Sequence, residues 1–263
     1  MRKLIYCEFL KLRRKPLVFA SSLLSALLPL AFTFLFSSAQ TSEEAVEDIM
    51  STMFQLSANL LLMPVIVVLA SNLLFEEQDN DTLKNLLAVP ISKTRLAAAK
   101  MLVLLLFSVL FMAVGSLISL AVVILQGWEP AGFWPLFFIG IGESFMMWVG
   151  ALPCILLIVA FNKSYIISVI ITFFYTIFNY LMTLSDTFIM QPLGLNPGTL
   201  LMGPLSFRWY FQFFSTHNES DAMIALLERL SPYFVSTAQA FSAVSIEAVI
   251  FLTLIAIVYK RQD

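Results

Sequence analysis

Two carboxylates are the side chains of this sequence most suited to chemistry, because both lie inside apolar stretches. Glu143 lies in 139-IGIGESFMMW-148, and Glu247 lies in 243-AVSIEAVIF-251. A carboxylate deep in a membrane costs on the order of a few kcal/mol, so each is expected to face protein or water. Two interpretations stay open for both residues. They either lie on the path of a substrate or proton, or they form hydrogen bonds between packed helices.

The remaining residues argue against an enzyme. The only histidine is His217, which excludes histidine-based triads and multi-histidine metal sites. The chain has no nucleophile-elbow, zinc-protease or phosphate-loop motif. The doublet Glu76 and Glu77 begins like the EExxxR motif of intramembrane prenyl-protein proteases, but position 81 is Asp. We therefore expect no catalytic residue, no metal site and no cofactor bound by this chain.

The composition is typical of a membrane protein. Hydrophobic residues make up 60% of the 263 residues and charged residues only 12%, whereas about a quarter of a soluble domain is charged. A helix of about 20 apolar residues crosses the hydrocarbon core of a bilayer. The sequence therefore predicts an all-α membrane protein, a single domain over 1–263 with six transmembrane helices. The expected spans are 17–38, 53–75, 101–125, 134–160, 165–185 and 239–259.

The positive charges predict the orientation of these spans. With both termini in the cytoplasm, the cytoplasmic segments carry 13 of the 15 Lys and Arg residues, as the positive-inside rule requires. Only Arg208 and Arg229 then lie outside. Segments 39–52, 126–133 and 186–238 are expected to be extracellular. No basic patch with interleaved aromatic residues follows the first fifteen residues, so nucleic acid is not an expected partner, whereas membrane lipid is.

Two segments differ from simple spans and loops. Residues 1–16 are expected to form a basic amphipathic helix in the headgroup plane, with Ile5, Phe9 and Leu12 on its apolar face and with Glu8, Lys11 and Lys15 on another face. Segment 186–238 is too apolar for a solvated loop and too rich in Pro and Gly for a span. Short or re-entrant helices are expected to cap the outer face there.

The most polar segment, 76-EEQDNDTLKNLLAVPISKTRLAAAK-100, follows the second span. Asp81 can cap a short helix in which leucines lie at i, i+3 and i+4, forming one apolar face with Lys84 directed elsewhere. Pro90 ends that helix, and Ser92 can cap the next one. The basic residues Lys93 to Lys100 are expected at the headgroup boundary. The leucine face either docks on a cytoplasmic partner or dips into the membrane surface.

This segment resembles the connection between the second and third spans of type-2 ABC exporter permeases. There an acidic stretch, a Thr-Leu-x-x-Leu-Leu helix and a Pro-x-Ser-Lys/Arg element precede a lysine at the next span. The N-terminal helix, the six spans and the long outer segment before the last span are similar too. The small size and phenylalanine-rich spans most resemble bacterial bacitracin-transport and lantibiotic-immunity permeases.

The resemblance implies a membrane-spanning half-transporter of the bacterial plasma membrane. It would pair with a second permease, identical or related, and with separate nucleotide-binding ATPase subunits that bind ATP and Mg²⁺. The cargo would be an amphipathic compound or peptide antibiotic moved outward. The matching residues would form a coupling helix seated on the ATPase: Thr82, Leu83, Asn85, Leu86 and Leu87.

A different class of protein would use the same polar segment in another way. A membrane sensor or assembly partner that transports nothing could hold a cytoplasmic protein through residues 76–100. A neighbouring gene for an ATPase without a membrane domain would favour the exporter, and a neighbouring kinase gene alone would favour the sensor.

Overall fold

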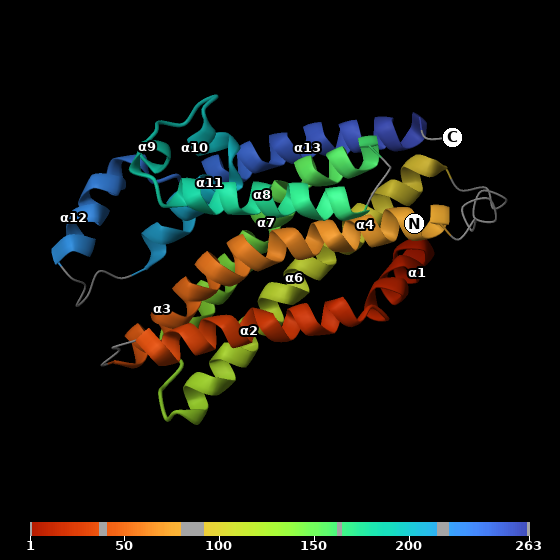
Figure 1. Ribbon diagram of the computed structural model, residues 1–263. Coiled ribbons are helices and arrows are strands. Elements are labelled where there is room, and N and C mark those ends of the chain that lie inside the picture. Colours follow the sequence, from red (N-terminus) through yellow and green to blue (C-terminus); the bar gives the residue numbers. More distant parts are fainter. Residues whose placement is uncertain (1, 37–40, 80–91, 162–164, 215–220, 262–263) are drawn as a thin grey trace.

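The computed structural model describes residues 2–36, 41–79, 92–161, 165–214 and 221–261, and in these ranges all regular structure is helical. The long helices lie side by side in one bundle (Figure 1). Their bounds are α1 Arg2–Arg13, α2 Pro16–Phe36, α3 Ser42–Thr52, α4 Met63–Asp79, α6 Lys93–Leu125, α7 Phe133–Phe161, α8 Tyr165–Thr183 and α13 Thr237–Arg261. Shorter elements are the π-helix η1 Met53–Leu62, α9 Asp186–Ile189, α10 Pro197–Leu200, α11 Met202–Tyr210, α12 Asp221–Leu230 and the 3₁₀ turns η2 Phe211–Phe213 and η3 Ser231–Tyr233.

Four of the expected spans are long and apolar enough to cross a membrane. They are Ser42–Leu74, Lys93–Leu125, Phe133–Phe161 and Thr237–Arg261. Helices α2 and α8 coincide with the first and fifth predicted spans, and their apolar stretches include Pro16–Ala31 and Val169–Thr183. Six spans therefore remain a prediction, whereas the described residues show an all-helical fold with four helices long and apolar enough to cross a membrane.

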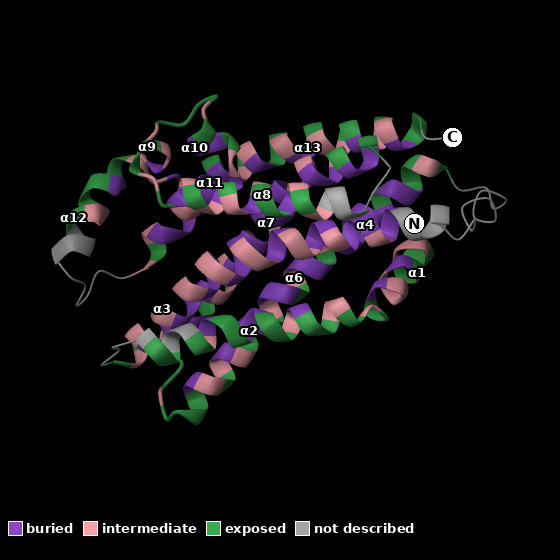
Figure 2. Cartoon of the chain, viewed as in Figure 1, coloured by how far each residue is buried: buried purple, intermediate pink, exposed green. Residues whose placement is uncertain are grey.

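The surface of the bundle fits a lipid environment. Large apolar side chains are exposed on α2, α6 and α7, with Phe34 81% and Phe138 68% exposed. Figure 2 shows exposed stretches along the outer sides of helices such as α2 and α13, and buried stretches where the helices face one another. Exposed apolar surface on this scale is unusual for a soluble monomer, so it agrees with the apolar composition.

The second span begins earlier than the sequence predicts. Residues 39–52 were expected to form an outer loop, but Ser42–Thr52 is helical and continues through η1 into α4. The Thr41 hydroxyl accepts a hydrogen bond from the Glu44 amide at 3.3 Å, and Glu43 and Glu44 lie in the first turn. A side-chain cap and early acids both stabilise a helix start. The acidic stretch that looked like a loop is therefore the first turns of the helix.

The π-helical stretch η1 lies in the middle of this long helix. The buried Asn59 side-chain amide donates to the Phe54 carbonyl, five residues earlier, at 3.0 Å. The Ser57 hydroxyl donates to the Ser25 carbonyl of α2 at 2.8 Å. Carbonyls of both helices are thus satisfied by buried polar side chains, which matters in an apolar interior because unpaired backbone groups are costly there.

The start of α6 agrees with the sequence. Ser92 is extended, and its side chain accepts a hydrogen bond from the Arg95 amide at 3.4 Å. The predicted cap is therefore confirmed, and the helix begins at Lys93 rather than at the apolar boundary near residue 101.

The two ends of the bundle carry different elements. Helix α1, both chain ends and the facing ends of α4 and α6 lie at one end, and α9, α10 and α12 lie at the other (Figure 1). The segment 186–238 thus forms short helices, as expected, although its place outside the cell stays a prediction. We call this second end the short-helix end.

Arg208 of α11 holds the short-helix end together. Its side chain is 1% exposed, and it donates from Nε to the Tyr233 carbonyl at 2.9 Å and from Nη1 to the Gly198 carbonyl at 3.1 Å. Burial lowers the pKa of this guanidinium from its ordinary value. One side chain therefore connects α11 to α10 and η3.

Candidate functional site

The five residues predicted to dock on a partner lie outside the described residues. Thr82, Leu83, Asn85, Leu86 and Leu87 all fall between Asp79, where α4 ends, and Ser92, which caps α6. Their role stays a prediction. What the structure does describe is the pair of helices that carry this segment and the contacts at its base.

A buried charge pair joins three helices at that base. Lys100 of α6 is fully buried, and its Nζ lies 3.1 Å from Oε2 of Glu8 in α1. The same Nζ donates to the backbone carbonyl of Leu73 in α4. Oε1 of Glu8 lies 2.8 Å from Nζ of Lys11, one turn further along α1. Lys100 therefore connects the helix before the polar segment, the helix after it and α1. We call these contacts the base junction.

The base junction corrects one prediction. Glu8 is predicted on the polar face of α1 with Lys11 and Lys15, but it is 1% exposed, while Lys11 remains 40% exposed. Lys100 is 0% exposed, and its place at the headgroup boundary stays a prediction. The reason for the burial of both side chains is their mutual pairing: α1 packs against α6, and a buried charge is tolerated where an opposite charge and a carbonyl satisfy it.

Helix α1 is held in this position by apolar contacts as well. Leu12 is buried, and Ile5 and Phe9 pack against the core. The predicted apolar face is therefore the face that contacts the bundle, and Glu8 lies among these residues. The amphipathic pattern gave the correct face for the apolar residues but could not show that one carboxylate shares it.

The second candidate, Glu143, lies in the interior of α7. It is fully buried, and neither carboxyl oxygen has a hydrogen-bond partner among the described residues. Ser206 of α11 approaches this carboxyl, but its hydroxyl donates to the Gly203 carbonyl at 3.1 Å instead. The phenol of Tyr210 lies close enough to interact electrostatically with Glu143, and its hydroxyl is also without a hydrogen bond.

The surroundings of Glu143 are aromatic and tightly packed. A Cβ added to Gly142 would meet Cη2 of Trp209 at 2.6 Å, so only glycine lets α7 and α11 approach this closely. The Tyr210 ring packs edge-on against Phe54, with centroids 5.2 Å apart. The prediction that Glu143 faces protein is confirmed. Both interpretations of this carboxyl stay predictions, since Ser206 approaches it although neither oxygen has a hydrogen-bond partner among the described residues.

Glu247 of α13 is placed differently. It is only partly buried and interacts electrostatically with Tyr175 of α8. No hydrogen bond or ion pair joins Glu247 to Glu143 among the described residues. The two carboxylates therefore do not form a pair, and a shared role as proton partners has no support in their geometry.

The base junction is the feature that the sequence did not reveal. Glu8 and Lys100 are 92 residues apart. Each lies in a segment rich in basic residues, so the local pattern predicts that both side chains face water. The available signal was weak: Lys100 is directly followed by 101-MLVLLLF-107, so its side chain starts inside an apolar helix.

These features define a class before a family. The chain is a helical bundle with apolar helices long enough to cross a membrane, in which α4 and α6, on either side of residues 80–91, are joined to α1 at one end. The described residues hold no group of three or more metal-ligating side chains. Residues 4–179 match the family described as ABC-2 family transporter protein. The chain therefore belongs to the ABC-2 transporter family. No curated protein matches it.

Proposed function

We propose that this chain is the membrane-spanning subunit of an ATP-driven exporter, in which a separate nucleotide-binding subunit hydrolyses ATP. The base junction is the observation that carries the proposal. Both helices that hold the polar segment, α4 and α6, meet at Lys100 with α1. A partner that pushes or pulls on residues 80–91 would therefore act on three helices together.

The mechanism follows from how such a junction transmits force. A loop between two independent helices could move without displacing either one. Here Lys100 connects the last turns of α4 to the first turns of α6 through one buried ammonium group, and Glu8 connects both to α1. Packed helices shift between discrete arrangements rather than deforming continuously. ATP binding in the partner would then favour one arrangement of the bundle over another.

Partners and ligands are part of this proposal. ATP and Mg²⁺ would bind to the ATPase subunit, and this chain would contribute Thr82, Leu83, Asn85, Leu86 and Leu87 to the contact. A second permease, identical or related, would complete the path across the bacterial plasma membrane, with both termini in the cytoplasm. The cargo would be an amphipathic compound or a peptide antibiotic of the bacitracin or lantibiotic type. The many aromatic residues of segment 186–238 support an amphipathic cargo.

The test is to disrupt the leucine face and follow the partner. Leu83→Asp combined with Leu86→Asp should abolish co-purification of the chain with its ATPase and the stimulation of ATP hydrolysis by the membrane subunit. Lys84→Ala is the matched control, since the helical pattern places Lys84 off that face. Membrane insertion should be normal in both variants.

Two results would contradict the proposal. Co-purification and ATPase stimulation that survive the double substitution would exclude this segment as the coupling contact. Capture of a kinase or another cytoplasmic protein in place of an ATPase would favour the sensor interpretation over the exporter.

A further inference from the structure

A pocket of about 390 Å³ lies at the short-helix end of the bundle. One wall comes from η2, and the other comes from the last turn of α12 and from η3. The two walls therefore lie on either side of residues 215–220 in the sequence. Its volume falls within the range of about 300–1,000 Å³ that is usual for small-molecule sites. The lining residues are Phe211, Gln212, Phe214, Leu227, Glu228, Ser231 and Phe234.

The walls of this pocket are aromatic and well supported. Phe211 stacks on Phe207 with ring centroids 4.6 Å apart. Phe214 packs edge-on against Phe54 and Tyr210, at 5.9 and 6.0 Å. Because these rings are held from behind by other rings, they present fixed surfaces to the pocket. Rigid aromatic walls favour a flat or bulky apolar ligand.

The polar groups at the pocket favour a positive charge. Among the described residues of the lining, Glu228 is the only charged one, and it is exposed, so its carboxylate is accessible to a ligand. Its neighbour Arg229 is directed elsewhere and lies 2.8 Å from Asp186 of α9. The Gln212 amide group donates to the carbonyls of Trp209 and Val235 at 2.7 and 2.9 Å. None of the described lining side chains therefore supplies a cation, and the donors of Gln212 are already used.

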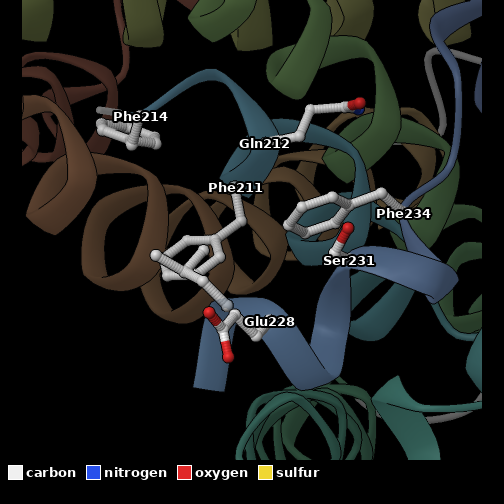
Figure 3. Close-up of a pocket in the computed structure, with 7 residues that line it drawn as sticks. Phe211, Gln212, Phe214, Glu228, Ser231 and Phe234 are labelled. Atoms are coloured by element: carbon white, nitrogen blue, oxygen red, sulfur yellow. The ribbon is translucent and has the colours of Figure 1, made fainter. Parts of the chain in front are cut away.

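Figure 3 shows the Glu228 carboxylate on the Phe211 side of the pocket and the Ser231 hydroxyl beside the Phe234 ring, with the end of the Gln212 side chain directed away from both. Aromatic faces attract cations through the negative potential above the ring. An aromatic lining that also holds one carboxylate thus forms a site for a cation that has an apolar body.

We infer that this pocket binds an apolar organic cation of single positive charge, and that its rings contact the apolar body while Glu228 faces the charge. The role of this ligand as cargo rests on the proposed function, whereas its binding does not. The site differs from the two interior carboxylates, because it lies at the bundle end opposite the base junction and requires no opening of the helices.

The test compares two probes of nearly the same shape and opposite charge. Tetraphenylphosphonium and tetraphenylborate are added to the purified full-length chain in nanodiscs of zwitterionic lipid, and bound probe is measured by equilibrium dialysis against empty nanodiscs. The wild-type chain should bind the cation saturably and should show no saturable binding of the anion. Glu228→Gln should weaken cation binding by about fivefold, as expected for an exposed charge contact. Phe234→Ala should weaken it by about tenfold, within the range of a cation–aromatic contact.

Two matched controls separate the pocket from general effects. Phe213 lies between two lining residues but does not line the pocket, so Phe213→Ala should leave cation binding unchanged. Glu129 is an exposed acid that also does not line it, so Glu129→Gln should likewise have no effect. Circular dichroism of each variant, compared with wild type, checks that the helices are intact.

Three outcomes would overturn the inference: equal saturable binding of cation and anion, equal losses in Phe213→Ala and Phe234→Ala, or cation binding that is unaffected by Glu228→Gln. Failure of the proposed function would look different. If the leucine substitutions leave ATPase coupling intact while the pocket still prefers the cation, the binding site stands and the coupling assignment falls. If the leucine substitutions abolish ATPase coupling but the pocket shows no charge preference, the coupling assignment stands and the binding site falls.

Discussion

Glu8 and Glu143 are equally hidden and differently partnered. Glu8 is 1% exposed, and both of its oxygens face lysine ammonium groups, at 2.8 and 3.1 Å. Glu143 is 0% exposed, and neither of its oxygens has a hydrogen-bond partner among the described residues. Burial therefore does not by itself assign a role to a membrane carboxylate. The partner decides whether the group locks helices together or stands alone among apolar side chains.

The two environments have different energetic consequences. Removing one member of a buried ion pair costs about 3–5 kcal/mol, because the other charge stays buried without compensation. Removing the charge of a carboxyl group that has no partner breaks no favourable contact. We therefore expect the loss of stability to be largest for substitutions at the base junction, smaller at Arg208 and smallest at Glu143.

Lys100→Met should have the largest effect. The substitution keeps much of the apolar stem but leaves Oε2 of Glu8 and the Leu73 carbonyl without Lys100. We expect a loss of about 3 kcal/mol, which for a chain of this size lowers the melting temperature by roughly 6–12 °C. Thermal unfolding of the detergent-purified protein, followed by size-exclusion chromatography, measures this loss.

A double substitution provides the control for Lys100→Met. Combining it with Glu8→Gln removes both charges and should recover part of the lost stability, since no uncompensated charge remains. Lys11→Met is the matched single change, because Lys11 is 40% exposed and exposed pairs contribute at most about 1 kcal/mol. A Lys11→Met loss as large as that of Lys100→Met would show that the junction is not centred on Lys100.

Arg208→Met should have the next largest effect. Arg208 is a buried cation whose partners are carbonyls rather than a carboxylate. Its charge is therefore less compensated than that of Glu8 and more compensated than that of Glu143. Losing its hydrogen bonds to Gly198 and Tyr233 should cost about 2–3 kcal/mol, as hydrogen bonds to charged groups do. Limited proteolysis should cut the short-helix end faster in this variant.

The control for Arg208 is the other arginine of the same segment. Arg229 pairs with Asp186 at 2.8 Å, but the two side chains are 63% and 51% exposed. Arg229→Met should therefore change stability by less than about 1 kcal/mol. Equal sensitivity of the two variants to proteolysis would mean that the Arg208 hydrogen bonds do not hold the segment.

Gly142→Ala tests how rigid the surroundings of Glu143 are. The new Cβ would lie 2.6 Å from Trp209 and 3.0 Å from Phe241, so the aromatic rings must shift. Overpacking of this kind costs about 1–3 kcal/mol. The comparison variant is Ala151→Gly, which lies in α7 like Gly142 and changes the side-chain size in the opposite direction. Gly127 is unsuitable as a control, because its φ of +85° would strain an alanine even though an added Cβ would meet nothing within 4 Å.

How far the sequence predicts these features depends on the distance over which each one acts. The helices, the Ser92 cap and the burial of Glu143 follow from local apolarity and capping residues. The early start at Ser42 was missed because 41-TSEEAVEDIM-50 is polar enough to be interpreted as a loop, although Thr41 followed by Glu43 and Glu44 is also a helix-start pattern.

Features that depend on the assembled bundle could not be predicted. Glu8 and Lys100 each belong to segments whose local pattern places charges in water, and only the packing of α1 on α6 makes them partners. The same holds for the pocket at the short-helix end. The sequence shows many aromatic residues in 186–238, but which of them line a cavity depends on how η2 and η3 meet.

Glu143→Gln should have the smallest effect on stability and therefore sharpens the comparison most. The amide has nearly the shape of the carboxyl group, and beyond the approach of Ser206 the carboxyl oxygens have no hydrogen-bond partner among the described residues. We expect a change in stability below about 1 kcal/mol, against a larger loss for Glu8→Gln, which removes a charge that two lysines face.

ATPase stimulation and transport of the purified complex, measured across its active pH range, then separate the two interpretations of Glu143. Unchanged transport at every pH would assign it to packing alone. Transport that falls while stability is unchanged would place the carboxyl group on the path of the substrate or proton. A stability loss in Glu143→Gln equal to that in Glu8→Gln would contradict the comparison, because the two buried carboxylates would then contribute equally despite their different partners.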